Sequence, residues 1–527
     1  MELKLDNVKE ISRLMDHAPQ YDIAKLTETT KKDPKWVAFG TGNIFRAYLA
    51  RIGQDLIHAG EFDRGIVVVE SRSHTAVDTV YTPNDNLAIS VTLKVSGDFE
   101  STLIGNISEV VFLHQELDRV KEIFRNPGLQ IVSYTITEKG YDIYNHEGNL
   151  SDQVEKDLQH DPLDSNHLMV ASVGLLHERF RQDLPVTMLS IDNLAKNGDV
   201  LKKAILTIAQ KYVEKGRFDQ AFLDYLQDEK KVTFPWSMID KITPGPDEKV
   251  AKYLEDKGLE DLGPYSRKKG APLAKYVNSE EAEYLAIEDR FANGRPDFSK
   301  AGVYLVDRET VDKIETMKVT ACLNPLHTTL AVYGCLLGYD RIYEEMKDPD
   351  LVSLITRLAY DEALPVVEDP GVIDPKDFVQ EVIHVRFPNP FMPDSPQRIA
   401  TDTSLKIPVR FGKTLSTYVA EGKALADLTY IPLALAGWLR YLLGINDEGK
   451  AFDLSPDPNL EKLQADLAGI KLGQFKVTVG LKELLSNAKF FGIDLVKIGL
   501  ADKVIAYLEE LCQGPGAVRK TLEKYRK

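Results

Sequence analysis

The sequence is poor in cysteine and lacks a long hydrophobic run. Only three of its 527 residues are cysteine (Cys322, Cys335 and Cys512), and they form no CxxC pair. That count excludes a disulfide-based scaffold and suits a reducing compartment. No stretch of about 18 apolar residues occurs, so we expect no membrane span. The N-terminal MELKLDNVKEISRLMDHAP also lacks the apolar core of a secretion signal. We therefore expect a cytoplasmic protein.

Positive charge is scarce as well. The chain has 65 Lys and Arg against 81 Asp and Glu, which gives a formal net charge of −16. A nucleic-acid backbone or an anionic membrane needs clustered basic residues, so neither is expected as a partner. A small anionic substrate is not excluded, because a few cations inside a cleft can outweigh the charge of the whole chain.

The composition is that of a folded protein of more than one domain. Hydrophobic residues make up 43% and charged residues 28% of the chain, which argues against extended disorder. A chain of 527 residues is too long for one hydrophobic core. Two large domains are therefore expected.

Short apolar runs alternate with helical stretches from residue 36 to about residue 245. Continuous apolar runs are typical of strands buried on both faces of a parallel sheet. The pattern predicts a doubly wound α/β domain of the Rossmann type over residues 1–310, with a helix-prone extension at 1–34 and a loop-rich insertion at 245–300. The clearest strand candidates are WVAF at 36–39, GIVVVE at 65–70, LQIVSY at 129–134 and PVTMLS at 185–190.

Beyond residue 311 the pattern becomes helical. Apolar residues recur at spacings of three and four, the spacing of one helix face. We therefore predict a mainly α-helical second domain over residues 311–527. The stretches that carry the pattern are 326–337, 351–364, 428–443 and 500–511.

A glycine-rich turn follows the first predicted strand. Two glycines, Gly40 and Gly42, allow a tight turn and a close approach of the backbone to a pyrophosphate, which the amides of the following helix attract. The third glycine of the usual pattern is replaced by Phe45. Taken alone, such a turn is more often a plain connection between a strand and a helix. The candidate cofactor residues here are Gly40, Gly42, Asn43, Ile44, Phe45 and Arg46.

Glu70 closes the next predicted strand. A carboxylate at this distance from the glycine turn is placed to bind the adenosine ribose hydroxyls and to repel a 2′-phosphate, which favours NAD over NADP. Arg72 follows two residues later, and its positive charge leaves that preference open. A structural reading of Glu70 is an exposed carboxylate at a strand end.

Two further segments place polar groups in apolar settings. SIDNL at 190–194 puts Asp192 and Asn193 directly after a predicted strand, at the edge where ligands bind in open α/β sheets. FPWSMIDKITP at 234–244 places Asp240 between prolines. Taken singly, each is more often a capping or turn motif than a site.

The segment KVTACLNPLH at 318–327 combines a lysine, an asparagine and a histidine. Asn324 before Pro325 predicts a helix start, with Asn324 as the cap. His327 then lies near the positive end of that helix, which favours its neutral form. Lys318 stands in an apolar run, where loss of water favours the neutral amine that proton transfer needs. The alternative is a surface lysine, a capping asparagine and a buried histidine. The sequence has no Cys and His cluster with metal-ligand spacing, so no metal is expected.

Taken together, these segments resemble the mannitol dehydrogenase family of long-chain polyol dehydrogenases, which includes the uronate reductases. The likeness runs from about residue 36 to beyond residue 410, and several ordered matches are far more specific than any one of them. They are GTGNIFRA, TITEKGY at 135–141, SIDNLAKNG, FPWSMIDKITP, KVTACLNPLH and RFPNPFMPDSPQRIATDTSLKIP.

The resemblance implies a role for each matching residue. Lys318 corresponds to the catalytic lysine, and Asn193, Asn324 and His327 to its catalytic partners. Asp240, Arg398 and Lys406 correspond to substrate-binding residues, and Thr137 joins the cofactor-binding set. Lys318 and Asn324 are six residues apart, one more than the family's usual spacing. Either an extra residue precedes the helix or the match at Lys318 is displaced, in which case Lys313 is the less attractive substitute because its setting is more polar.

The resemblance therefore implies a metal-independent, NAD-dependent oxidoreductase that acts on a sugar acid or polyol. The long NP-to-KIP segment is most similar to the uronate reductase branch, so we expect fructuronate reductase activity, which interconverts D-fructuronate and D-mannonate. Tagaturonate reductase and mannitol 2-dehydrogenase are the alternatives within the family. A nucleotide-binding sensor that has lost the chemistry and a purely structural helical protein are the alternatives outside it.

Overall fold

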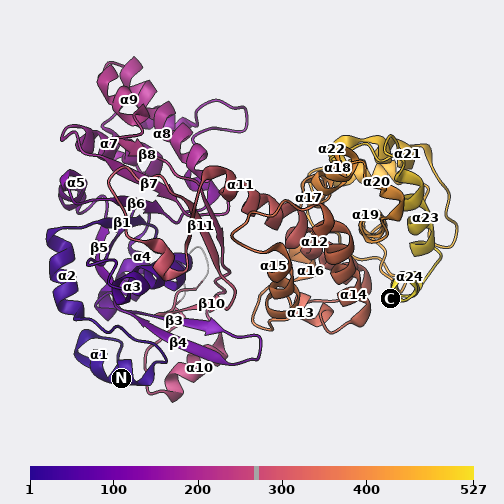
Figure 1. The fold of residues 1–527 in the computed structure, drawn as a ribbon, viewed down its shortest axis with the longest axis horizontal. Helices are drawn as coiled ribbons and strands as arrows, with labels where there is room; N and C mark the ends of the chain where they lie inside the picture. The colour runs from indigo at the N-terminus through magenta and orange to yellow at the C-terminus, as the bar shows by residue number, and fades with distance from the viewer. Residues whose placement is uncertain (266–271, 527) are drawn as a thin grey trace. The chain divides into compact units, whose positions relative to one another are not determined.

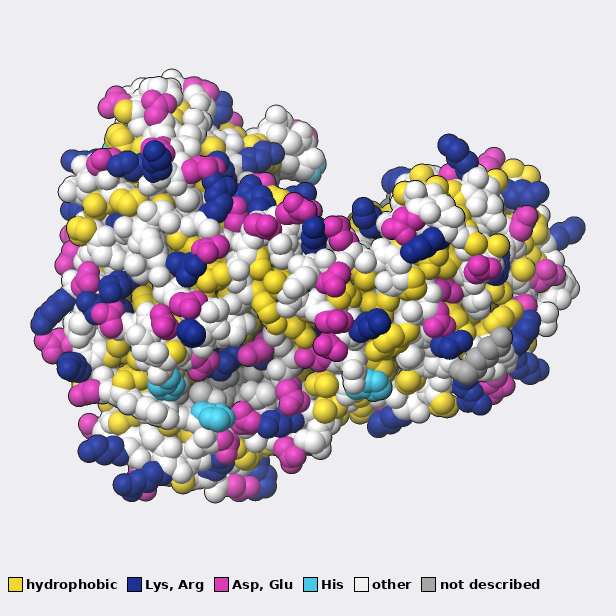
Figure 2. Space-filling view, in the orientation of Figure 1, with side chains coloured by type: hydrophobic (Ala, Val, Ile, Leu, Met, Phe, Trp, Pro, Cys, Tyr) yellow, Lys and Arg dark blue, Asp and Glu magenta, His cyan; other side chains and the backbone are white. Residues whose placement is uncertain are grey.

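The structure is a computed structural model that describes residues 1–265 and 272–526. The chain forms two compact units (Figure 1). Unit 1 comprises Met1–Lys94 and Asp98–Asp312, and unit 2 comprises Val95–Gly97 and Lys313–Lys527. No helix in the described part of the chain is both long and apolar enough to cross a membrane. On the face drawn in Figure 2, acidic and basic side chains are interspersed.

Unit 1 is built on a six-stranded sheet in which every neighbouring pair of strands is parallel. The strand order is β5-β2-β1-β6-β7-β8, so in the order of the sequence the strands lie 3-2-1-4-5-6. This is the order of dinucleotide-binding Rossmann domains, and the predicted fold class is confirmed. The strands are β1 (Trp36–Phe39), β2 (Ile66–Glu70), β5 (Ile107–Phe112), β6 (Ile131–Tyr134), β7 (Val186–Ser190) and β8 (Val232–Thr233).

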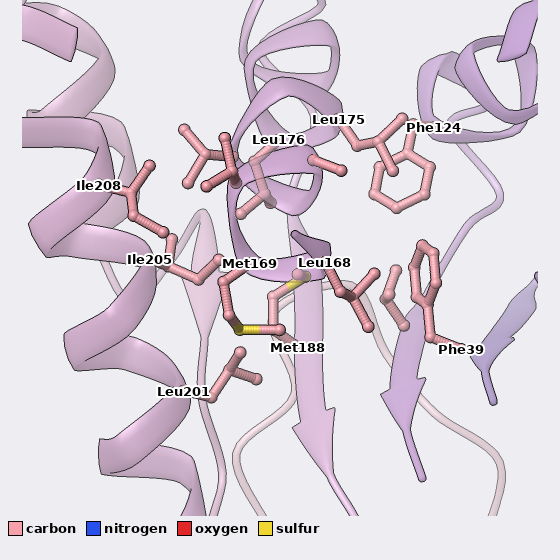
Figure 3. Packing of buried hydrophobic residues seen from close by; sticks show 14 of the residues in the cluster. Phe39, Phe124, Leu168, Met169, Leu175, Leu176, Met188, Leu201, Ile205 and Ile208 are labelled. Atoms are coloured by element: carbon pink, nitrogen blue, oxygen red, sulfur yellow. The ribbon is translucent and has the colours of Figure 1, made fainter. Parts of the chain in front are cut away.

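Both faces of this sheet are covered, which explains the continuous apolar runs. Successive strand residues point to opposite faces, so Trp36 and Ala38 belong to one core and Val37 and Phe39 to the other. Figure 3 shows the second core, where side chains of two helices meet Met188 of β7. The helices of unit 1 are α1 (Val8–Leu14), α2 (Ile23–Lys32), α3 (Ala50–His58), α4 (His74–Ala76), α5 (Leu117–Arg125), α6 (Asp152–Asp157), α7 (Leu168–Phe180), α8 (Asn197–Glu214), α9 (Gln220–Gln227) and α10 (Glu248–Asp256).

Two small sheets complete unit 1, and one expectation is corrected there. The first has the order β10-β3-β4 and the second β12-β11-β9. The predicted loop-rich insertion at 245–300 is wrong in part, because it supplies β10 and β11. Its strands were hidden by buried polar residues whose groups are paired: Asn278 donates to the carbonyl of Gly245, and Glu280 accepts from the amide of Ile242. The strands are β3 (Ala88–Leu93), β4 (Phe99–Ile104), β9 (Ser237–Asp240), β10 (Tyr276–Glu280), β11 (Tyr284–Glu288) and β12 (Tyr304–Val306).

Unit 2 is helical, as predicted. Its centre is formed by two almost wholly buried helices, α12 and α19, which pack against each other. Helix α11 (Arg308–Met317) spans the boundary between the units. The helices that follow are α12 (Asn324–Leu337), α13 (Ile342–Glu345), α14 (Pro349–Arg357), α15 (Pro375–Glu381), α16 (Pro396–Ile399), α17 (Thr403–Arg410), α18 (Gly412–Ala420), α19 (Tyr430–Tyr441), α20 (Leu460–Asp466), α21 (Val479–Ser486), α22 (Ala488–Phe491), α23 (Ala501–Leu511) and α24 (Ala517–Tyr525).

Candidate functional site

The turn after β1 lies where the strand order of the large sheet reverses, which is the ligand-binding point of such sheets. Gly40 has a φ of +116°, and a Cβ built on it would lie 2.5 Å from the carbonyl oxygen of Thr135. Gly42 is exposed, and a Cβ there would meet no atom within 4 Å. The turn therefore packs tightly against the protein at Gly40 and has free space beside it at Gly42. An open glycine before helical amides is what a phosphate-binding turn requires.

The side chains that follow the turn support it from within. Phe45 is fully buried in the core of unit 1. Arg46 is also buried, and its Nη1 donates to the carbonyl of Ala274 at 2.8 Å while its Nη2 donates to Oδ1 of Asn43 at 3.0 Å. Ile44 is half-buried. A ligand at this turn would consequently meet the backbone of Phe45 and Arg46, not their side chains.

Glu70 lies at the end of β2, next to the glycine turn. Its carboxylate accepts hydrogen bonds from the Thr41 hydroxyl at 2.5 Å and from the amide of Arg72 at 2.7 Å. These bonds fix the carboxylate beside the turn, where a ribose diol would be bound. Thr137, the remaining cofactor candidate, is exposed in the segment after β6.

Two of the sequence motifs meet beyond β7. The Tyr141 hydroxyl, from TITEKGY, donates to Oδ2 of Asp192 at 2.6 Å. Burial raises the pKa of Asp192, and the bond from Tyr141 opposes that rise. Asp192 also accepts from the amide of Leu194, so it holds the loop that carries the exposed Asn193. Asp192 is thus a structural support, and Asn193 is the polar group left available for a ligand.

Asp240 lies in a different sheet from the other candidates of unit 1. It ends β9, pairs with Tyr284 of β11, and is buried at 5% exposure. The adjacent Lys241 is buried as well, and its ammonium binds the carboxylate of Glu283 at 2.8 Å. The strand that carries Asp240 begins beside the end of β7, where the Ser237 hydroxyl donates to the carbonyl of Ser190 at 2.6 Å.

The extra residue between Lys318 and Asn324 is accommodated in a π-helical turn. Helix α11 passes directly into a π-helix at Lys318–Cys322, where the amide of Leu323 donates to the carbonyl of Lys318 at 3.1 Å. A π turn contains about one residue more than an α turn and is frequent at functional sites. The sixth residue therefore lies within a helical path, not in a loop. Lys313 forms an ion pair with Glu368 at 3.1 Å, which makes it a poorer proton carrier.

Helix α12 begins at Asn324, so the predicted capping role of this residue is wrong. The π-helical turn already provides the helical residues before it, and Leu323 is the capping position. The Asn324 side chain is half-buried and makes no hydrogen bond to any residue within the described ranges 1–265 and 272–526. Its amide is consequently available to a ligand.

His327, one turn further along α12, is held in its neutral form. Burial lowers its pKa to about 3, with further lowering by the charges of Arg410, Arg398, Arg386 and Lys406. The ring packs against Phe387, and its buried Nε2 lies 3.4 Å from Oδ2 of Asp394. This Nε2 makes no hydrogen bond within the described part of the chain. The imidazole is therefore a neutral hydrogen-bonding group in a positive environment.

Three of the four cations around His327 come from two short helices that pack against α12, and the fourth, Arg386, ends the π-helical turn Val382–Arg386. Arg398 of α16 is largely exposed and forms an ion pair with Asp394. Lys406 of α17 is half-buried, donates to the carbonyl of Ile399 at 3.0 Å, and has a pKa lowered by burial and by Arg410. Two of the three substrate-binding candidates of the resemblance, Arg398 and Lys406, thus lie beside His327.

Sequence reasoning missed Asp394, Arg386 and Arg410. Asp394 and Arg386 are buried. Both belong to the RFPNPFMPDSPQR segment, which begins at Arg386. Arg410 follows Lys406 by four residues, which places both on one side of α17. That spacing was the one signal in the sequence that could have identified Arg410.

Comparison with known proteins identifies both units. Residues 34–300 match the mannitol dehydrogenase Rossmann domain, and residues 310–512 match the mannitol dehydrogenase C-terminal domain. A D-mannonate oxidoreductase from Thermotoga maritima is 48% identical over 96% of this chain and 95% of its own. A substrate-free D-sorbitol dehydrogenase has a TM-score of 0.81 at 25% identity and covers 99% of this chain and 100% of its own. Mannitol 2-dehydrogenase from Pseudomonas fluorescens, in a ternary complex with NAD and D-mannitol, has a TM-score of 0.69 at 27% identity and covers 99% of both chains.

The low pKa of His327 should make the protein less stable in acid. Because the folded pKa is about 3 and the unfolded value is about 6.5, the unfolded chain binds the extra proton between these limits. Stability is therefore complete above about pH 6.5 and falls as the pH drops towards 3. Between pH 7.5 and 5.0 the free energy of unfolding of His327→Gln should fall by about 2 kcal/mol less than that of wild type.

Urea unfolding of both proteins at the two pH values measures this difference. His384→Gln, at an exposed histidine of the same unit, is the control. Equal losses in wild type and His327→Gln would show that His327 titrates normally in the folded protein.

Proposed function

The chain belongs to the mannitol dehydrogenase family, and from that premise we propose that it is an NAD-dependent oxidoreductase that interconverts D-fructuronate and D-mannonate. The observation that carries the proposal is the 48% identity, over 96% of the chain, to a D-mannonate oxidoreductase. The cations around His327 support it independently, because a sugar acid carries a carboxylate and a polyol does not.

The residues around the turn after β1 fit a dinucleotide. Gly42 leaves open space where a pyrophosphate would approach, and Gly40 sets the tight turn before the helix. The Glu70 carboxylate, fixed by Thr41 and Arg72, suits a ribose diol and disfavours a 2′-phosphate. These features support NAD as the cofactor, in line with the NAD complex of the related mannitol 2-dehydrogenase. When bound, NAD accepts the hydride from the alcohol carbon.

The proposed proton carrier is Lys318. Oxidation of a secondary alcohol requires that the hydroxyl proton leave together with the hydride, and reduction requires the reverse. The Lys318 amine takes that proton in oxidation and returns it in reduction. The side-chain amide of Asn324 donates a hydrogen bond to the oxygen as negative charge develops on it, and Asn193 of unit 1 remains a predicted catalytic partner. This division of roles leaves Lys318 as the group that changes its charge.

His327 orients the substrate in this proposal. Its neutral imidazole can hold a hydroxyl group without exchanging a proton near neutral pH, since its pKa is about 3. The buried Nε2, which no described residue hydrogen-bonds, is the atom that would do so. Arg398 and Lys406 lie beside it and would contact the sugar-acid chain, while Asp240 of unit 1 is the remaining substrate-binding candidate.

The two glycines of the turn should respond differently to alanine. Gly40→Ala should cost about 1–3 kcal/mol in stability, because a positive φ and a contact at 2.5 Å are both unfavourable for a side chain. Gly42→Ala should leave stability unchanged, because the added methyl group meets no protein atom within 4 Å.

Gly42→Ala should nevertheless weaken NADH binding about 10-fold or more, because the methyl group occupies the approach of the pyrophosphate. Thermal unfolding and fluorescence titration with NADH measure the two effects. Binding as tight as that of wild type would show that the turn does not hold the cofactor.

A substrate panel tests the proposed reaction. Wild type and Lys318→Ala are assayed for oxidation of NADH and of NADPH with D-fructuronate, D-tagaturonate and D-fructose. We expect the highest kcat/KM for D-fructuronate with NADH. Lys318→Ala should lower kcat about 100-fold or more, because general acid–base catalysis is lost, while NADH affinity stays within about threefold.

The other outcomes each identify an alternative. Faster reduction of D-tagaturonate or of D-fructose would indicate tagaturonate reductase or mannitol 2-dehydrogenase. NADH binding without turnover of any substrate would indicate an inactive sensor. Near-normal turnover by Lys318→Ala would remove that lysine from its proposed role.

A further inference from the structure

Arg410 of unit 2 carries a positive charge that has no role in the proposed proton transfer. It ends helix α17, is half-buried, and reaches helix α12. Its Nη1 donates to the carbonyl of Asn324 at 3.2 Å and to the hydroxyl of Thr328. These bonds place the guanidinium beside the two residues of α12, Asn324 and His327, that are proposed to act on the substrate.

Arg410 has no anionic partner in the part of unit 2 that the structure describes. No carboxylate among the described residues 313–526 lies within ion-pairing distance of its guanidinium. Two other arginines of unit 2 form ion pairs, Arg357 with Asp361 and Arg519 with Asp348, whereas the buried Arg440 donates to three backbone carbonyls. Burial lowers the pKa of Arg410 to about 10, so it remains charged at neutral pH. A partly desolvated charge without a counter-ion is costly.

The open side of the guanidinium is suited to a carboxylate. Both hydrogen bonds of Arg410 to described residues use Nη1, so Nε and Nη2 donate to none of them. Neither nitrogen is among the atoms that are buried without a partner, so both reach accessible space. Two parallel N–H donors on one edge of a guanidinium bind a carboxylate in the bidentate manner.

We propose that Arg410 binds the carboxylate of the sugar-acid substrate and so selects sugar acids over neutral polyols. The inference deepens the proposed function and rests on it. The carboxylate supplies the counter-ion that Arg410 lacks among the described residues of unit 2, and the contact of Arg410 with Asn324 sets the distance between the anchored carboxylate and the reacting oxygen. Lys406 and Arg398 add positive charge nearby, but each is already engaged, Lys406 by Ile399 and Arg398 by Asp394.

A purely structural role for Arg410 leads to different expectations. If its function were to hold α12 against α17, its removal would weaken binding of charged and neutral ligands alike. If Arg410 binds the carboxylate, its removal weakens the binding of charged ligands only. Measuring one ligand of each kind separates the two roles.

The test uses the complex of the full-length protein with NADH, to which D-mannonate or D-mannitol is added. Neither pair can react, because both members are in their reduced form, so calorimetry gives a Kd without turnover. Wild type should bind D-mannonate at least about 10-fold more tightly than D-mannitol. Arg410→Gln should weaken the binding of D-mannonate about 30-fold or more, because charge-assisted bonds are lost. The same variant should change the Kd of D-mannitol less than about threefold.

Two further variants complete the test. Arg410→Lys should recover part of the affinity for D-mannonate, since it restores the charge without the bidentate geometry. Arg357→Gln removes a half-buried arginine of the same unit and should bind both ligands as wild type does. The proposal is overturned if Arg410→Gln keeps its affinity for D-mannonate within about threefold, or if it weakens both ligands equally.

The proposed function fails separately from this inference. Absence of D-fructuronate reduction by wild type would refute the function, whatever Arg410→Gln does. A normal rate with D-fructuronate, combined with unchanged D-mannonate binding by Arg410→Gln, would refute only the role of Arg410.

Discussion

An excess of positive charge around one neutral imidazole is the constraint on which the account of unit 2 depends. Burial lowers the pKa of His327, four basic side chains lower it further, and Asp394 lies beside the ring. Among these four, Arg410 has no carboxylate of the described residues within ion-pairing distance, and a partly desolvated charge without a counter-ion destabilises a folded protein. Because the chain as a whole carries a net charge of −16, this concentration of cations is local and cannot reflect a generally basic surface.

The same positive charge distinguishes an enzyme for sugar acids from an enzyme for neutral polyols. A hydroxyl group needs hydrogen-bonding partners, and in the proposed function Asn324 and His327 would be those partners for any polyol. A carboxylate needs a counter-charge, which a half-buried arginine can provide and a histidine with a pKa of about 3 cannot. Proton transfer and substrate choice are therefore assigned to different side chains. Mutations at Lys318 and at Arg410 are expected to change different kinetic constants.

The sequence predicted most of what depends on local pattern. Four of the six strands of the large sheet, β1, β2, β6 and β7, were predicted, because burial on both faces leaves unbroken apolar runs such as 66–69. Strand β10 was missed because its buried Asn278 and Glu280 are paired with backbone groups far along the chain. Arg410 was missed for a related reason. Its significance comes from a contact with Asn324, 86 residues away, and from the absence of a counter-ion among the described residues 313–526, neither of which has a local signature.

The most direct test of the central claim is the protonation of His327, read from the ring ¹⁵N shifts of the NADH-bound protein and assigned with His327→Gln. The account predicts that the ring stays neutral from pH 7.5 down to 5.0. It also predicts that D-mannonate raises the pKa of His327, because its carboxylate offsets the surrounding cations, whereas D-mannitol leaves it unchanged. A His327 that titrates near pH 6.5 without ligand, or that responds equally to both compounds, would contradict the account.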